Sequence, residues 1–421
     1  MINNPAIKLN STSKSNLVFN NIVTRIHMVL ALIVIAWMNN GFFTYAMPYV
    51  PNFIRYGLYF AWLGLALVGN KRFFEKFIKQ TWPLLLFFCY MLLISLFVET
   101  DLVVYIKSIS YLIMVYSIFL YYFNSRHIKF QKLLSVFFIL DCIAVGINTY
   151  IQLQINPLLV RYLATGMDTR ERLLGTEAFP GIGSYGYFYA LVAIIILLAF
   201  LFLNQRKRKP LLLLAIVVTI ALLIQAAYTI AILFTFIFIA LLIILRYGNK
   251  YTVISIVVLG IISLLIFQGV FASMFSQLAD IQGIPYEVSV RFDELAGFFS
   301  GNDVSGTDLN SRQGLYLQSV DAFANNLLTG TVVNDSSVYR AGGHSAWLDL
   351  LATFGLFSIP FFIFIYNAYK YCKNRVPIMF KSFVKVYWLY FVCLGFINTL
   401  LFAPILYHMV LVFARIYKCL F

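Results

Sequence analysis

A histidine between glycines and a serine is the residue of this sequence best suited to chemistry. His344 stands in the tetrapeptide Gly-Gly-His-Ser at 342–345, directly before a long apolar stretch. Glycines let a backbone approach a ligand closely, and Ser345 is of a type that caps helices. Free N–H groups at a helix start bind anions, and an imidazole serves as a general base near neutral pH. The segment predicts a catalytic or anion-binding site, with an ordinary loop histidine as the alternative.

Arg312 is the second candidate, because of its place at the expected start of a helix. It follows Asp308 and Ser311 and opens a stretch, 311–327, with a rough helical pattern. A cation is disfavoured by the dipole at a helix N-terminus. Unless Asp308 offsets it, its placement suggests an anionic partner such as a phosphate. A solvated arginine paired with a loop carboxylate is the alternative.

Three further arginines are candidate phosphate ligands. Arg340 lies four residues before the histidine. Arg170 and Arg172 lie in a separate segment, beside Asp168 and Glu171. These neighbouring carboxylates favour a solvated, self-paired segment over a binding role for the second pair.

Two charged residues lie within apolar stretches. Lys107 and Asp141 each fall inside an expected membrane helix, where ionisable residues are costly and mark function by default. They pair with each other in one interpretation, and Lys107 extends to the membrane surface in another. In a transporter, Asp141 would be a proton or ion site.

The composition places the chain in a membrane. Hydrophobic residues make up 62% and charged residues only 11%, whereas globular domains are about half apolar and a quarter charged. The basic stretches behind the net charge of +15 lie in short gaps between apolar spans, as the positive-inside rule predicts for cytoplasmic loops. We therefore expect no nucleic-acid partner. The five cysteines have no metal-ligand spacing and predict neither a disulfide framework nor a metal site.

Stretches long enough to cross a bilayer, which takes roughly 20 apolar residues, set the expected fold. The apolar run 210–245 is too long for one helix and divides near Gln225-Ala226. We expect an all-α polytopic membrane protein of about twelve transmembrane helices, at 29–47, 53–69, 82–98, 102–123, 133–152, 184–203, 210–225, 227–245, 252–270, 345–368, 384–402 and 404–418.

The charges of the connections give the orientation. Every second connection is basic, which places these connections and both termini in the cytoplasm. A medium outer loop, 153–183, and one large extracytoplasmic loop, 271–344, remain; the large one lies between helices 9 and 10. It separates residues 1–270 from 345–421 within a single membrane domain. Loops of this length are usually functional or disordered.

Part of the large loop is expected to be helical. Its segment 311–327 has apolar residues at helical spacing, which predicts a helix that lies on or dips into the membrane surface. The residues of this stripe are Leu315, Val320, Phe323 and Leu327.

Short motifs follow one another between 305 and 356: Gly306-Thr307, Ser311-Arg312-Gln313-Gly314-Leu315-Tyr316, Asn326-Leu327-Leu328-Thr329-Gly330, Gly342-Gly343-His344-Ser345-Ala346-Trp347-Leu348-Asp349-Leu350-Leu351 and Gly355-Leu356. In order and spacing they resemble the core of the bacterial O-antigen polymerase and O-antigen ligase family (Wzy-like and WaaL-like proteins). The dozen helices, cytoplasmic termini and large periplasmic loop of that family agree with the expected topology across the whole chain.

The resemblance implies an extracytoplasmic membrane glycosyltransferase with inverting chemistry and no metal or other cofactor. Its partners would be undecaprenyl-diphosphate-linked oligosaccharide as donor and acceptor, the lipid bilayer, a chain-length regulator and a flippase. Arg312 matches the family's loop arginine, and His344 matches the histidine before the next helix, as general base or diphosphate ligand. Arg340 aligns with no family residue, and we take Asp349 and Lys107 as supporting residues.

The sequence departs from the family at one place. An arginine often lies between the paired helices that correspond to 210–245, where this chain has Gln-Ala-Ala-Tyr-Thr at 225–229. The phosphate site is then either incomplete or completed by Arg170 or Arg172.

Four functions stay open, one of which is a receptor or assembly component with no chemistry. The Gly-Gly-His-Ser form with Asp349 resembles polymerases of O-antigen, capsule or exopolysaccharide pathways, which join lipid-linked repeat units. An O-antigen ligase, which transfers glycan to another acceptor, is the near alternative. A lipid-linked glycan flippase or transporter that uses Asp141 and Lys107 is the alternative from a different class. The expected location is the cytoplasmic (inner) membrane of a bacterium, with the active site on the extracytoplasmic side.

Overall fold

The structure is a computed structural model of the whole chain. It describes residues 23–35, 52–98, 102–122, 128–155, 182–183, 185–205, 208–226, 228–248, 266–282, 286–300, 308–333 and 341–398, together with the single residues 159, 251, 255 and 262.

Within these ranges the chain is helical and contains no strand. The helices are Val23–Ile35, α3 (Asn52–Gly69), α4 (Lys71–Ile94), α5 (Val103–Tyr122), α6 (Ile128–Ile155), α9 (Tyr185–Asn204), α10 (Lys209–Gln225), α11 (Thr229–Tyr247), α13 (Gln268–Ala279), α14 (Tyr286–Ser300), α15 (Asp308–Asn325), α16 (Ala346–Phe354), the 3₁₀ turn η3 (Gly355–Ser358), α17 (Ile359–Asn374), the 3₁₀ turn η4 (Ile378–Phe380) and α18 (Lys381–Ile397). Seven helical segments of the described chain are long and apolar enough to cross a membrane. The protein is a polytopic helical membrane protein.

Two helix boundaries test the sequence prediction directly. α10 ends at Gln225 and α11 begins at Thr229, which confirms the expected division of the apolar run 210–245. α4, by contrast, begins at Lys71, eleven residues before the expected start at 82. The expected loop is helical because lysine and arginine are good helix formers, and Lys76 is held in place by donating a hydrogen bond to the carbonyl of Leu120 (2.6 Å).

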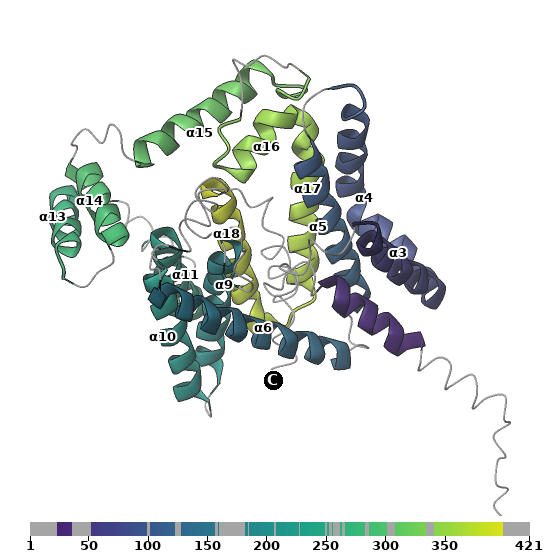
Figure 1. Cartoon of the computed structure of the whole chain (residues 1–421), viewed down its shortest axis with the longest axis horizontal. Coiled ribbons are helices and arrows are strands. Elements are labelled where there is room, and N and C mark those ends of the chain that lie inside the picture. The colour runs from purple at the N-terminus through teal and green to yellow at the C-terminus, as the bar shows by residue number, and fades with distance from the viewer. Residues whose placement is uncertain are drawn as a thin grey trace, which may run out of the picture.

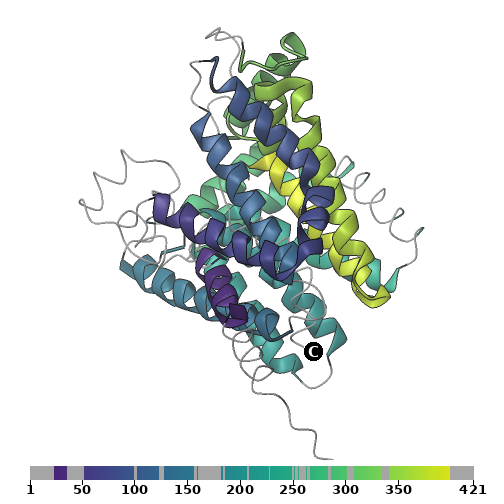
Figure 2. The same ribbon diagram turned by 90° about the vertical axis from the view of Figure 1, so that its right-hand side faces the viewer.

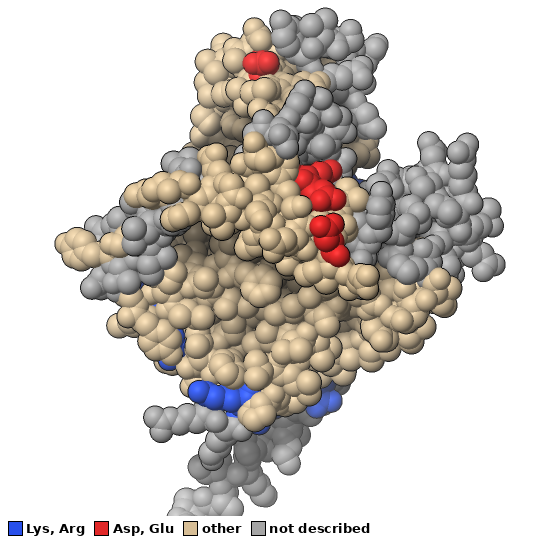
Figure 3. Space-filling model, turned by 90° about the vertical axis from the view of Figure 1, so that its left-hand side faces the viewer, with Lys and Arg blue, Asp and Glu red and all other residues tan. Residues whose placement is uncertain are grey.

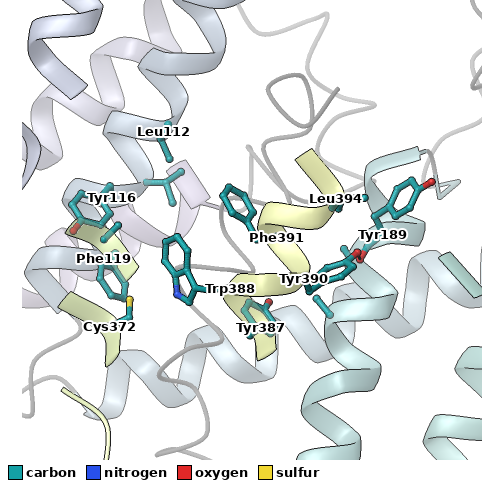
Figure 4. Close-up of a cluster of buried hydrophobic side chains, with 14 of the residues drawn as sticks. Leu112, Tyr116, Phe119, Tyr189, Cys372, Tyr387, Trp388, Tyr390, Phe391 and Leu394 are labelled. Carbon is teal, nitrogen blue, oxygen red and sulfur yellow. Dashed lines mark hydrogen bonds between the residues drawn. The ribbon is translucent and has the colours of Figure 1, made fainter. Parts of the chain in front are cut away.

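The centre of the bundle is built from helices that are apolar on every side. α5 is buried without a break from Leu112 to Leu120, as is typical of a helix enclosed by others. Figure 4 shows Trp388 and Phe391 of α18 between the side chains of α5 and those of α9. Tyr390 of α18 donates a hydrogen bond to the backbone carbonyl of Tyr189 in α9 (2.6 Å). α18 therefore connects the two sides of the bundle.

The expected large loop contains three helices. α13 and α14 form a hairpin that Figure 1 places beside the bundle, and its contacts include the stacked rings of Phe275 and Phe299. α15 lies across the top of Figure 1, next to α16. The predicted helix over 311–327 is thus confirmed, with Asp308 as its first residue and Asn325 as its last.

The expected helix 345–368 is broken rather than continuous. α16 ends at Phe354, η3 follows, and α17 begins at Ile359 with Pro360 in its first turn. Proline is favoured at a helix start because it lacks the N–H that would there be unbonded. Figure 2 shows α17 beside the helices α4 and α5, and Phe87 of α4 contacts Phe354 and Phe361 on both sides of the break.

The break is crossed by the chain that follows α15. Thr331 and Val332 donate backbone hydrogen bonds to the carbonyls of Ala352 and Thr353 (2.9 and 3.0 Å). Gly330 has φ +70°, and a Cβ there would lie 2.2 Å from the carbonyl oxygen of Thr353. Gly355 has φ +56°, and a Cβ there would lie 2.5 Å from the carbonyl oxygen of Leu328 in the crossing segment. Two glycines therefore allow two backbones to cross in contact.

Charge is distributed unevenly over the surface. On the face drawn in Figure 3, acidic residues occupy the upper half and basic residues the lower end, and a broad band between the two ends is uncharged apart from the acidic cluster at its edge. Such separation of basic from acidic residues is expected of a membrane protein, whose basic residues concentrate on one side.

We predict that Gly330→Ala destabilises the protein. A Cβ in a left-handed conformation costs about 1–2 kcal/mol, and the contact with Thr353 adds to this cost because its nearest atoms are backbone. The free energy of unfolding should fall by about 2 kcal/mol or more, measured by thermal unfolding in detergent. Gly314→Ala is the matched control, since a Cβ at this position in α15 meets no atom within 4 Å. If the two variants were equally stable, the close backbone contact between Gly330 and Thr353 would be wrong.

Candidate functional site

The candidate site lies where α15 packs on the start of α16. The packed face of α15 carries Ser319, Ala322 and Asn326, which are all buried. The predicted apolar stripe is divided, because Val320 and Leu327 are exposed on the other side. Small residues let the two helices approach closely, and the Ser319 hydroxyl contacts a carboxylate described next. The exposed part of the stripe remains free to meet lipid.

The carboxylate of Asp349 is the centre of this contact. Asp349 is only 5% exposed, and burying such a group is costly unless hydrogen bonds replace water. Its Oδ1 accepts hydrogen bonds from the Ser319 hydroxyl (2.7 Å) and from the backbone N–H of Gly343 (3.1 Å). Its Oδ2 accepts one from the N–H of Ser345 (3.0 Å). One side chain thus holds the loop on both sides of His344.

Ser345 completes the turn into α16. Its hydroxyl accepts a hydrogen bond from the N–H of Leu348 (3.2 Å), and its own N–H donates to Asp349. This reciprocal arrangement is a form of the capping box, and Asp349 also suits the helix dipole. Ser345 as a helix cap is confirmed. The expected binding of an external anion to these N–H groups is wrong for Gly343 and Ser345, because Asp349 already occupies them.

His344 is presented by this clamped loop. Its side chain is exposed, and Gly343 before it takes the left-handed conformation with φ +81°. The charges of His344 and Asp349 are close enough to interact. An exposed histidine on a rigid loop can accept a proton or donate to an anion.

Gly342 fits the loop against α15. A Cβ at this position would lie 2.0 Å from the backbone oxygen of Leu315, and the N–H of Gly342 donates to the Ser319 hydroxyl (2.8 Å). Ser319 therefore connects the loop, α15 and Asp349 through a single oxygen atom. The position of the loop depends on how closely α15 can approach.

The other side of the site rests on α18. Trp347 donates a hydrogen bond to the carbonyl of Val392 (2.8 Å), and its indole fills the space over Gly395, where a Cβ would come within 2.1 Å. The N–H of Ala346 donates to the carbonyl of Asn398 (3.1 Å). These bonds fix the first turn of α16 against a central helix of the bundle.

The other predicted site residues are not all placed. Arg312 is the fifth residue of α15, seven before Ser319, which is roughly 10 Å along the helix. It lies beyond the first turn, so the dipole argument for its anionic partner does not hold. Arg340, Arg170 and Arg172 lie outside the residues that the structure describes.

Lys107 and Asp141 do not form the expected ion pair. Lys107 is exposed and lies over the ring of Tyr111, with its ammonium 5.9 Å from the centroid. Asp141 is buried in α6, and its Oδ1 has no hydrogen-bond partner. An ion pair between Lys107 and Asp141 therefore does not explain why either charged residue lies in an apolar helix.

Sequence reasoning missed Ser319 and Tyr105. Tyr105 of α5 shares a hydrogen bond with the hydroxyl of Thr353 (3.4 Å), and its charge would interact with that of Asp349. Neither residue belongs to a pattern that indicates chemistry. The spacing of seven residues from Arg312 to Ser319 is the one available signal, since it corresponds to two turns of a helix.

We predict that Asp349→Ala loosens the histidine loop without unfolding the bundle. Two N–H groups and one hydroxyl lose a charged acceptor, and each such bond contributes about 1.5–3 kcal/mol. Hydrogen exchange at the amides of Gly343 and Ser345 should accelerate at least about tenfold, as followed by mass spectrometry. Asp321→Ala, at an exposed site in α15, is the control and should leave exchange unchanged. Unaltered exchange in both variants would refute the clamp.

A double-mutant cycle should detect the bond between Ser319 and Asp349. The variants Ser319→Ala and Asp349→Asn each weaken the same contact, so their effects on the free energy of unfolding should be non-additive by about 1 kcal/mol. Denaturant unfolding of the four proteins measures this coupling. Ser319→Ala combined with Asp293→Asn, exposed in α14, serves as the control cycle and should be additive within about 0.5 kcal/mol. If the effects of Ser319→Ala and Asp349→Asn were additive, the two side chains would not interact, and Ser319 would not belong to the site.

No protein-family model and no curated protein matches this chain.

Proposed function

We propose that the protein is a polysaccharide polymerase that joins polyprenyl-diphosphate-linked oligosaccharide repeat units at the outer face of a bacterial cytoplasmic membrane. The observation that carries the proposal is the exposed His344 on a loop that Asp349 clamps at the start of a membrane helix. The motifs that resemble O-antigen polymerases and ligases contain both residues. The proposed product is an O-antigen, capsular or exopolysaccharide chain.

The proposed reaction transfers a glycan from one lipid carrier to another. A hydroxyl oxygen of the acceptor sugar attacks C1 of the donor sugar, and a new C–O bond forms with inversion. The bond between C1 and the diphosphate oxygen breaks, and the lipid diphosphate leaves with the electron pair. In one assignment His344 takes the proton of the attacking hydroxyl. In the other it donates a hydrogen bond to the diphosphate, whose developing charge needs donors and cations.

Arg312 is the proposed cation of the site. It lies in the helix that carries Ser319, and this helix is bound to the histidine loop through Asp349. A guanidinium recognises a diphosphate in bidentate fashion. Arg340, which immediately precedes the described segment 341–398, and Arg170 or Arg172 would complete the phosphate site. The separation of acidic and basic surface supports an outer site.

The proposed topology has about twelve membrane helices with both termini in the cytoplasm. α15 and the histidine loop then belong to the large outer loop, and α10 and α11 would each cross the membrane although α10 has only 17 residues. The basic residues at the start of α10 and the end of α11 support this orientation.

A transporter or flippase is the second candidate. The observation that favours it is the buried Asp141 in a membrane helix, whose Oδ1 lacks a hydrogen-bond partner. Such residues mark ion or proton paths. It shares no contact with the histidine loop among the described residues, so variants can separate the two functions.

We predict that His344→Ala and Arg312→Ala abolish polymer formation. Loss of a general base lowers a rate by about 10²–10⁴-fold, and loss of a phosphate-binding arginine acts on the same step. The measurement uses the purified protein with lipid-linked repeat units and follows the ladder of chain lengths. Transfer to a different acceptor without a ladder would indicate a ligase.

Asp321→Asn, exposed on the same helix as Arg312, is the matched control and should retain the ladder. If both site variants kept full activity, the assigned site would be wrong. If only Asp141→Asn abolished function in cells, a transporter would be favoured.

A further inference from the structure

α3 and α5 contact each other through long side chains and run in the same direction. Tyr59 of α3 shares a hydrogen bond with the Ser117 hydroxyl of α5 (3.1 Å), and one turn later Trp62 donates to the Tyr122 hydroxyl (3.5 Å). At the start of the pair, the guanidinium of Arg55 donates a hydrogen bond to the Tyr111 hydroxyl. The residue numbers of these contacting pairs increase together along both helices, so the two helices are parallel. Their N-termini therefore lie on the same side of the bundle.

Two cations lie beside the same tyrosine, Tyr111, at these N-termini. Arg55 reaches Tyr111 from α3, and Lys107 lies over the same ring from the preceding turn of α5. Lys107 is exposed, and no carboxylate in the described part of the chain pairs with it. We call Arg55, Tyr56, Lys107 and Tyr111 the α3–α5 cation patch.

Among the residues that the structure describes, those beside the patch are apolar and exposed. Phe53 is 75% exposed and Val103 66%, and Ile54 and Val104 beside them are also exposed. In a membrane protein such side chains face lipid, while tyrosines and cations concentrate at the level of the headgroups. A ligand of the patch therefore comes from the bilayer, with its apolar part along these side chains.

We infer that the α3–α5 cation patch binds the phosphate of an anionic membrane lipid. A guanidinium and an ammonium on separate helices match a phosphate group, one through paired donors and the other as a point charge. The two tyrosine hydroxyls supply further hydrogen bonds. No carboxylate of the described chain pairs with Lys107, and a lipid phosphate supplies the missing anion. The site stands apart from the histidine loop and does not depend on the proposed glycosyl transfer.

Native mass spectrometry of the full-length protein tests this inference. The probes are phosphatidylglycerol and undecaprenyl phosphate, with phosphatidylcholine as the zwitterionic comparison and glycerol phosphate as the soluble one. One anionic lipid should bind with high affinity. The double variant Arg55→Gln with Lys107→Gln should weaken it at least about tenfold, because two charge-assisted contacts are lost.

The matched control removes a lysine and an arginine at the C-terminal end of α17. Lys373 lies over Tyr369 (5.5 Å) and Arg375 over Tyr371 (4.1 Å), so Lys373→Gln with Arg375→Gln removes the same two charges from beside tyrosine rings. This control should change the affinity of the tightly bound lipid by less than about threefold. If the first double variant fails to fold, Lys107→Gln alone serves, because its side chain is exposed.

Three results would overturn the inference. The first is equal binding of phosphatidylcholine, since charge would then not select the ligand. The second is displacement of the lipid by an equal concentration of glycerol phosphate, since the lipid tail would then play no part. The third is equal weakening by both double variants, since the effect would then come from net charge alone.

Discussion

The arrangement of α15, the histidine loop and the start of α16 depends on one buried carboxylate. Asp349 accepts hydrogen bonds from the Ser319 hydroxyl and from two backbone N–H groups of the histidine loop. A buried acceptor without partners costs far more than a satisfied one gains, so this group dictates the positions of its three donors. α15, the loop and the first turn of α16 take their places around it. The close approach at Gly342 and the small buried face of α15 follow from the same requirement.

A second constraint is the break after α16. The chain that leaves α15 forms backbone hydrogen bonds with residues 352–356, across the end of α16. These carbonyls would otherwise lie unbonded in an apolar environment, where each unsatisfied group is costly. The crossing therefore both ends a helix and attaches the outer segment to it. Trp347, placed over Gly395, then connects this unit to α18 and the centre of the bundle.

Much of the helical framework could be predicted from hydrophobicity alone. The division at Gln225, the helical character of 311–327 and the cap at Ser345 follow from local composition, which the structure confirms. The early start of α4 could not be predicted, because charged residues at a membrane boundary continue a helix as readily as they end it. Nor could the hydrogen bond of Ser319 to Asp349, thirty residues apart. A serine in a polar helix has no pattern of its own, and its importance comes only from the carboxylate that tertiary packing brings to it.

The order of Asp349 and its partners along the chain has a consequence for biosynthesis. Ser319, Gly343 and Ser345 all precede Asp349 in sequence, so every donor has been synthesised before the carboxylate leaves the ribosome. The contacts of Trp347 and Ala346 with α18 involve residues made later. The clamp can therefore close during insertion, before the helix on which it finally rests exists. The histidine loop can therefore be complete before α18 packs against it.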